Sequence, residues 1–192
     1  MAKSRTPVIL GLAALLVGLV ILFILGISPE RIARQVETPE TPVGVNAPTK
    51  ETKTVTLFFL REEDDLFVPE TRTIPVAATV AQEAESLLTE LINGSKNGLP
   101  SALPVETKVG QIFVTKEGVA YADFSKELSA AHPSGSEAEK ATVFAIVNSL
   151  AYNFKTIKKV FILVDGEERE TLNGHIALNR AFAPDFSLVA KD

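Results

Sequence analysis

The longest apolar run in the chain covers residues 8–27 and contains no charged side chain. At about 1.5 Å per residue, a helix of this length spans roughly 30 Å, which matches the hydrocarbon core of a bilayer. A helix packed on a soluble core keeps polar residues on one face, and this run has none. The pattern predicts a transmembrane helix.

A cleaved signal peptide is the alternative, because Lys3 and Arg5 lie in the short tail of residues 1–7. The apolar run is longer than the usual signal core of about 7–15 residues, and no good cleavage site follows it. We therefore expect an uncleaved signal anchor. The tail and the terminal amine carry three positive charges, against Arg31 and Arg34 beyond the run. This balance favours a cytoplasmic N-terminus and an extracytoplasmic (periplasmic) domain on the inner, cytoplasmic membrane.

Residues 28–53 contain four prolines among Glu, Thr and Gly, with little apolar patterning. Such a segment buries too little surface to offset its ordering entropy, so it predicts a linker. A flexible chain of this length averages roughly 25–30 Å from end to end. A continuation of the membrane helix over residues 29–36 remains open.

Residues 54–188 show the alternating and periodic patterns of a folded domain. The β-rich run 55–60, the polar turn 62–65 and the segment 66–74 predict a first hairpin. Because proline cannot donate to a strand ladder, Pro69 predicts an edge position or a bulge.

A helix is predicted from residue 80, where apolar residues repeat at helical spacing. Thr79 and Gln82 form a capping box at its start, and Asn93–Gly94 is a typical stop. Residues 108–115 and 119–124 then alternate around a glycine-bearing turn, which predicts a second hairpin.

A second helix is predicted to open at Ser136, with Glu139 completing another capping box. Residues 160–164 form a hydrophobic strand, Asp165–Gly166 is a hairpin turn, and residues 167–172 are its expected return strand. The order is therefore ββα-ββα-ββ. We predict an α+β fold with a largely antiparallel sheet and two helices on one face, preceded by one transmembrane helix.

Five segments in this order resemble the GerMN domain, named for the sporulation protein GerM: Leu99–Pro104, Gly118–Ser125, Val147–Leu150, Val164–Glu167 and Thr171–His175. The similarity covers about residues 55–178. It implies a fold like that of ring-building domains and a non-catalytic interaction module of the bacterial envelope. The chain differs from GerM in having one domain, a predicted membrane helix in place of a lipidated cysteine, and a long linker.

The sequence offers few residues for catalysis or metal binding. No cysteine is present, and the two histidines, His132 and His175, lie in different predicted loops, where solvated or turn roles are favoured over metal ligation. The acidic run 62–65 lacks the ligand spacing of a calcium loop. Ser125, His175 and Asp165 lack the strand–elbow–helix motif of a nucleophile. We predict no catalytic residue, no metal and no cofactor, and hence a protein that is not an enzyme.

Three residues are the first candidates for a polar ligand, although a structural role is favoured for each. Asp123 ends a predicted strand and is expected to cap the turn that follows. Asn148 lies on an apolar helix face, where a buried amide needs partners. His175 follows Asn173–Gly174.

Residues 54–192 carry thirteen Lys or Arg against twenty Asp or Glu, a net charge of −7. An acidic domain of this kind argues against nucleic acid as a partner. The leading hypothesis is a membrane-tethered module that docks to an envelope protein or to copies of itself. The alternative is a cell-wall (peptidoglycan) binder that assists a wall-remodelling or sporulation system. Against it, the chain has no Trp, only Tyr121 and Tyr152, and phenylalanines expected in the core or membrane.

Overall fold

The computed structural model describes residues 51–191. The predicted tail of residues 1–7, the transmembrane helix of residues 8–27 and the linker up to residue 50 lie outside the described residues. Among residues 51–191, no helix is long and apolar enough to cross a membrane.

The first hairpin pairs β1 (Thr52–Arg61) with β2 (Leu66–Pro75) in antiparallel register along their whole length. They form a two-stranded sheet, so the predicted edge position of Pro69 is confirmed. The Ala190 amide donates to the Phe67 carbonyl at 2.9 Å on the side of β2 that faces away from β1. Backbone groups two residues apart in a strand point to the same side, so the nitrogen of Pro69, which has no hydrogen to donate, faces the same outer edge as Phe67.

The helix α3 (Val80–Ile92) begins as its capping pattern predicts, because the Gln82 amide donates to Thr79 Oγ1 at 3.2 Å. Its buried stripe includes Leu87 and Leu91. The helix ends at Asn93, followed by Gly94 in the left-handed region that glycine tolerates.

The second sheet has the strand order β3 (Val109–Val114), β4 (Val119–Phe124) and β5 (Lys159–Val164). Strands β3 and β4 are antiparallel, whereas β4 and β5 are parallel. The connection between β4 and β5 contains α4 (Glu127–Ala130) and α5 (Ser136–Asn153), and a crossover of this length joins parallel strands. The α+β class is confirmed, with two sheets and one parallel pairing.

The predicted return strand over residues 167–172 is wrong. Only an isolated bridge joins Val164 to Glu167, and the following charged residues are exposed. The outer edge of β5 instead pairs with Phe182, which exchanges two backbone hydrogen bonds with Val160 at 2.9 and 2.8 Å. A buried phenylalanine occupies this edge in place of the charged segment. The short 3-10 helix η1 (Phe186–Leu188) follows.

The predicted capping box of the second long helix is also wrong. Gly135 is the N-cap of α5 and supplies no side-chain bond. Glu139 is turned away from the cap and bonds to a different loop, described below.

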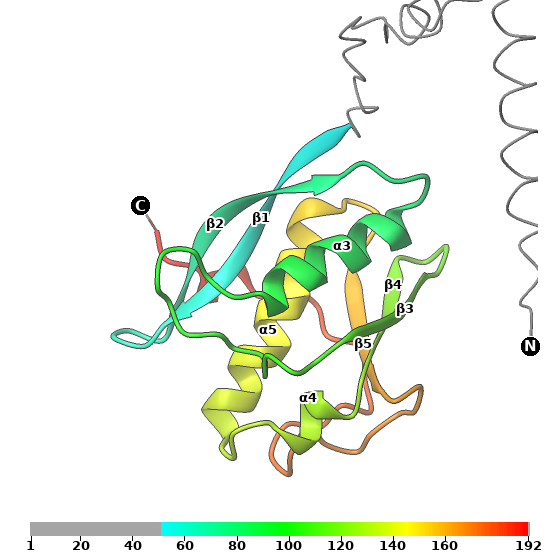
Figure 1. The fold of residues 1–192 in the computed structure, drawn as a ribbon. Helices are drawn as coiled ribbons and strands as arrows, with labels where there is room; N and C mark the ends of the chain where they lie inside the picture. The colour runs from blue at the N-terminus through cyan, green and yellow to red at the C-terminus, as the bar shows by residue number, and fades with distance from the viewer. Residues whose placement is uncertain (1–50, 192) are drawn as a thin grey trace, which may run out of the picture. The chain divides into compact units, whose positions relative to one another are not determined.

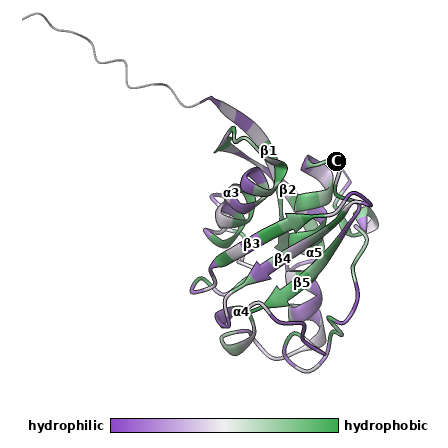
Figure 2. Ribbon diagram, turned by 90° about the vertical axis from the view of Figure 1, so that its right-hand side faces the viewer, coloured by the Kyte–Doolittle hydropathy of each residue, from purple (hydrophilic) through white to green (hydrophobic). Residues whose placement is uncertain are grey.

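Helix α5 lies between the β1–β2 hairpin and the three-stranded sheet, and α3 packs against α5, β1, β2 and β3 (Figure 1). Figure 2 looks onto the outer face of the three-stranded sheet, with α5 behind the strands and none of the described helices in front of them. The core fills the space between these layers and includes large, fully buried side chains: Leu57, Phe59, Phe67, Leu87, Leu91, Phe124, Ile146, Leu150 and Ile162.

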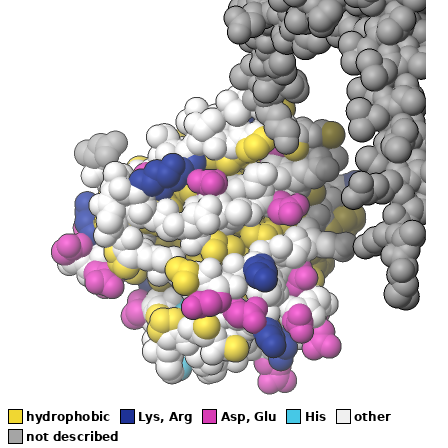
Figure 3. Space-filling view, in the orientation of Figure 1, with side chains coloured by type: hydrophobic (Ala, Val, Ile, Leu, Met, Phe, Trp, Pro, Cys, Tyr) yellow, Lys and Arg dark blue, Asp and Glu magenta, His cyan; other side chains and the backbone are white. Residues whose placement is uncertain are grey.

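The acidic charge of the domain is spread over its surface. In Figure 3, Asp and Glu side chains surround the visible face, with few Lys and Arg between them. One ion pair is buried on both sides, in which Arg72 Nη1 lies 2.5 Å from Glu70 Oε1.

Candidate functional site

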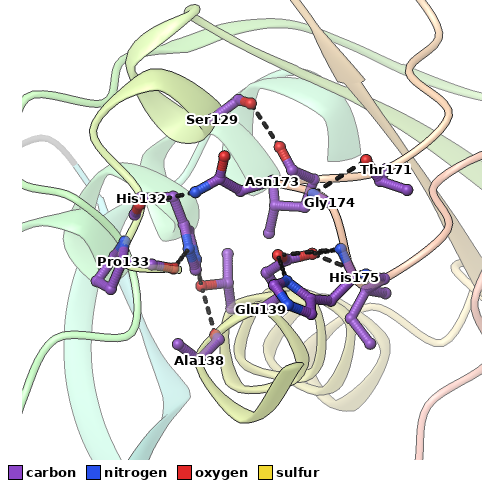
Figure 4. A network of polar contacts seen from close by, with 12 residues as sticks. Ser129, His132, Pro133, Ala138, Glu139, Thr171, Asn173, Gly174 and His175 are labelled. Carbon is purple, nitrogen blue, oxygen red and sulfur yellow. Dashed lines mark hydrogen bonds and ion pairs between the residues drawn. The ribbon is translucent and has the colours of Figure 1, made fainter. Parts of the chain in front are cut away.

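The most extensive polar network of the described residues centres on Glu139, in the first turn of α5 (Figure 4). Its carboxylate is fully buried. The amides of His175 and Ile176 donate to Oε2 at 3.1 and 2.7 Å, and His175 Nδ1 lies 2.8 Å from Oε1. A single carboxylate therefore fixes the loop around His175 to the start of the helix.

The environment of Glu139 favours its charged form. Burial alone raises the pKa of this carboxyl, but the donors of Ile176, His175 and Asn173 outweigh burial and hold its pKa below the ordinary value. A carboxylate that accepts several N–H bonds is a stable anion and a poor proton donor. The geometry therefore fits a structural clamp.

His132 belongs to the same network and is buried, which corrects the expectation of a solvated side chain. Its Nδ1 lies 2.7 Å from the Pro133 carbonyl and its Nε2 lies 2.6 Å from Thr142 Oγ1. Asn173 Nδ2 donates to the His132 carbonyl at 3.0 Å. The ring therefore bonds to its own loop and to α5, and the carbonyl of His132 joins the loop before α5 to the loop after β5.

Of the three candidates for a polar ligand, His175 lies closest to this network. Its ring is 44% exposed on one side and bound to Glu139 on the other. The favoured turn role agrees with this position, because the His175 amide and ring both serve the Glu139 clamp.

Asp123 does not cap the turn that follows it, so that expectation is wrong. Its Oδ1 accepts from the Gly166 amide at 2.8 Å, across the sheet at the end of β5. Its Oδ2 lies over Gly110, where an added Cβ would approach it to 2.6 Å. The carboxylate reaches Gly166 because the parallel pairing of β4 with β5 brings both strand ends together.

Asn148 is fully buried and satisfied by the C-terminal segment. Its Nδ2 donates to the Asp185 carbonyl at 3.0 Å, and the Asp185 amide donates to its Oδ1 at 2.9 Å. The expected need for buried partners is met by backbone, and the pair fixes the segment before η1 onto α5.

The structure does not bring Asp123, Asn148 and His175 into one site, because each bonds to a different segment. Asn148 lies about 13 Å along α5 from the Glu139 that holds His175. No group of three His, Asp or Glu side chains within residues 51–191 has metal-binding geometry. In the acidic turn, Asp64 pairs with Arg61 at 2.7 Å.

The outer face of the three-stranded sheet carries a row of aromatic side chains, which we call the aromatic face. Phe113, Tyr121 and Phe161 lie directly opposite one another on β3, β4 and β5. The rings of Tyr121 and Phe161 stack with centroids 5.3 Å apart. Phe113 is 66% exposed, Tyr121 is half-buried and Phe161 is only 9% exposed. These side chains point away from α5, because successive residues of a strand face opposite sides and the next residues, Ala122 on β4 and Ile162 on β5, are buried in the core.

A second aromatic group, which we call the aromatic cleft, lies where the C-terminal segment meets α5. Phe58, Tyr152 and Phe186 pack together with centroids 5.4 to 6.2 Å apart. They line a cleft of about 490 Å³, in which Tyr152 and Phe186 are about half exposed. Lys155 Nζ lies 5.8 Å from the Tyr152 ring centroid, and Lys191 is also at the cleft.

The assignment of the phenylalanines to the core or the membrane is right for Phe58 and Phe161, which are buried, but it missed the exposed Phe113 and Phe186. Alternation was the available signal for the aromatic face. Phe113, Tyr121 and Phe161 all fall one position away from small or aliphatic residues that face the core. The cleft had no local signal, because Phe186 is far from Phe58 in the sequence.

The fold and the matching residues identify the class of this protein. Residues 56–170 match the family model described as "Germane: Sporulation and spore germination". The chain belongs to this family, and the similarity to the GerMN domain inferred from sequence is confirmed. No curated protein matches the chain.

Solved structures show the same fold. The tandem GerMN domains of the sporulation protein GerM from Bacillus subtilis are 24% identical, with a TM-score of 0.54 over 69% of this chain and 46% of that one. This chain thus spans about half the length of the tandem protein. The first GerMN domain alone is 23% identical, with a TM-score of 0.53 over 68% of this chain and 97% of that one. A putative lipoprotein from Clostridium perfringens is 23% identical, with a TM-score of 0.51 over 73% and 95%.

Proposed function

We propose that this protein is a non-catalytic, membrane-tethered interaction module of the bacterial cell envelope, which docks to a protein partner through the aromatic face. The domain lies on the extracytoplasmic side of the inner membrane, and the N-terminus is cytoplasmic.

The aromatic face is the observation that carries this proposal. The exposed ring of Phe113, beside the half-buried Tyr121 on a sheet face that no helix of residues 51–191 covers, is unfavourable in water. Aromatic side chains are enriched at the buried centres of protein interfaces. A partner that covers this face removes the apolar surface from water.

The roles of the polar candidates support a structural rather than a chemical use of the domain. Asp123, Asn148 and His175 each direct hydrogen bonds to backbone or side chains of the chain itself. Their polar atoms hold together segments that are distant in sequence.

The tether rests on the charge-free apolar run of residues 8–27. A structural relative is described as a putative lipoprotein, which is a second form of membrane attachment. A linker of roughly 25–30 Å keeps the domain near the bilayer, where membrane-proximal partners are found.

A photo-cross-linking residue in place of Phe113, in the full chain in intact cells, tests this proposal. We expect a covalent adduct heavier than the monomer. The matched control places the same residue at Val105, which is 71% exposed on a loop outside the aromatic face, and should give little adduct. Monomer alone from both positions would overturn the proposal.

Cell-wall binding is the second candidate function, and the aromatic cleft favours it. Exposed aromatic rings form platforms for sugar rings, and a nearby lysine suits a carboxylated glycan or peptide. The half-exposed Tyr152 and Phe186 beside Lys155 provide both features. Such a protein would assist a wall-remodelling or sporulation system.

Co-sedimentation of the detergent-solubilised full chain with purified peptidoglycan tests the second candidate. Tyr152→Ala should abolish pelleting, and Phe113→Ala, an aromatic truncation outside the cleft, should leave it unchanged. Pelleting that is equal in both variants and in the parent chain would show that the cleft is not the binding site.

A further inference from the structure

The three-stranded sheet has ends of opposite charge. Strands β4 and β5 are parallel, so both begin at one end, where the Lys159 amide donates to the Gly118 carbonyl at 3.2 Å. Lys159 lies in the row of the outer face next to the aromatic row, opposite Val119. It is exposed and pairs with no acidic side chain within residues 51–191.

Asp123 lies in the row on the other side of the aromatic residues, opposite Leu163. The exposed Asp165 follows at the same end, where its amide donates to the Phe124 carbonyl at 2.7 Å. The aromatic face is therefore flanked by a cation on one side and by a carboxylate on the other.

The turns add charge of both signs. Lys116 and Lys158 strengthen the basic end, where Glu117 is the opposing acid. Lys108 lies at the acidic end, because its amide donates to Ser125 Oγ at 3.0 Å. On the strands of the outer face itself, Lys159 and Asp123 are the charged positions.

We propose that the aromatic face pairs with the aromatic face of a second copy of this chain, about a two-fold axis that runs along the aromatic row. The proposal rests on the proposed function and names the partner that the docking surface takes.

Charge selects this axis. A two-fold interface uses the same patch on both subunits, so each patch must complement itself. Rotation about the aromatic row exchanges the two ends of the sheet and places Lys159 of one copy over the Asp123 row of the other. Rotation about an axis along the strands would exchange β3 and β5 and keep each end of the sheet over the same end of the other copy, so that the basic ends repel each other and no opposite charges meet.

The size of the face sets the strength of the pairing. Three strands of six residues present about 300 Å² of sheet surface, at about 4.8 Å between strands and 3.3 Å per residue. A standard stable interface takes about 800 Å² from each partner. The pair is therefore weak in dilute solution and forms where a tether concentrates the domains at a membrane surface.

A cross-linking experiment on the full chain in cell membranes tests the pairing. The chain has no cysteine, so Phe113→Cys creates a single reactive thiol. The proposed axis places β3 over β3, and packed sheets lie about 10 Å apart, beyond the span of a disulfide. A short bismaleimide should therefore link the two thiols.

We expect a product of twice the chain mass from Phe113→Cys and mostly monomer from Val105→Cys. Adding Lys159→Glu to Phe113→Cys should lower the dimer yield at least fivefold at low salt. Asp123→Asn, which keeps its bond to the Gly166 amide, should lower it less. Both effects should shrink at high salt, because salt screens exposed charge. Unchanged yields in both charge variants would overturn the proposed axis.

The photo-cross-linking residue at Phe113 separates this inference from the proposed function. An adduct of twice the chain mass supports both. An adduct of any other mass overturns pairing between copies and leaves docking to a different protein in place. Monomer alone overturns both.

Discussion

Asn153 pairs with the backbone of Thr56 as a neighbouring strand would. The Thr56 amide donates to Asn153 Oδ1 at 2.9 Å, and Asn153 Nδ2 donates back to the Thr56 carbonyl at 2.6 Å. Two residues further along β1, the Phe58 amide donates to Ser149 Oγ at 3.1 Å. Side chains of α5 thus occupy the edge of β1 that β2 leaves open, and they close it to further strands.

Asn153→Ala should destabilise the domain by about 1–3 kcal/mol. The substitution removes both bonds and leaves the part-buried Thr56 amide without its acceptor. Urea unfolding followed by circular dichroism measures the change. The control Asn179→Ala removes an exposed amide and should stay within about 0.5 kcal/mol. Equal stability of the two variants would contradict the role of Asn153 as an edge cap.

Glu139→Gln should weaken the fold at neutral pH and make it less sensitive to acid. The amide cannot accept all the N–H donors that the carboxylate accepts, which costs roughly 2 kcal/mol. The pKa of Glu139 is depressed in the fold, so its contribution is complete above the unfolded value of about 4.3 and is lost as pH falls through the folded value.

The measurement is a series of urea midpoints from pH 7 to pH 3. The parent chain should lose stability below about pH 4.3, and the variant should lose less over the same range. Some acid sensitivity should remain, since the pKa of Glu70 is also lowered. Glu85→Gln replaces an exposed helical carboxylate and serves as the control, with a pH profile like that of the parent. Parallel curves for Glu139→Gln and the parent would contradict the clamp.

Arg72→Ala should cost about 3–5 kcal/mol, because it leaves the buried Glu70 carboxylate without its cation. Burial opposes ionisation of Glu70, and hydrogen bonds from Ser95, Lys96 and Arg72 lower its pKa against that penalty. The double variant Glu70→Gln with Arg72→Ala should recover part of the loss, measured as a coupling in a double-mutant cycle. Strictly additive losses would show that the pair does not act as a unit.

Gly118→Ala should destabilise the turn between β3 and β4 by more than about 2 kcal/mol. Its φ is +90°, and an added Cβ would lie 2.7 Å from the Thr156 carbonyl. Gly98 has a similar φ of +80° with open space around it, so Gly98→Ala should cost only about 1 kcal/mol. The difference between the two thermal midpoints isolates the steric clash, and equal midpoints would rule it out.

Much of the fold was predictable from sequence because its signals are local. The Thr79 cap, the Glu62–Asp65 turn and the helical stripe of α3 each depend on residues close together in the chain. The parallel pairing of β4 with β5 was missed because apolar alternation identifies strands and not their neighbours.

The edge of β5 shows why the last predicted strand failed. The Asp165–Gly166 signal correctly marked a turn, in which both residues have positive φ. What lies beside β5 depends on a competition between the charged return and the buried Phe182. Phe182 occupies the edge because its ring is buried against Phe144 and the core, and no local sequence pattern indicates this contact.

The surroundings of the candidate residues were predicted only in part, because their partners are distant in the sequence. A buried partner for Asn148 was foreseeable from its apolar surroundings, but its identity as the Asp185 backbone was not. The pattern around Glu139 matched a capping box equally well, because sequence cannot distinguish a cap amide from the amides of a distant loop.

The pairing of Ala190 with Phe67 has a consequence for synthesis. Among residues 51–191 no strand lies beside the outer edge of β2, and the Phe67 carbonyl on that edge accepts its bond from Ala190, far along the chain. During translation the first hairpin is made long before Ala190, so the outer edge of β2 is exposed during that time. The edge is covered only once residue 190 has been made, so a chain that ends earlier keeps an open strand edge onto which another strand can add.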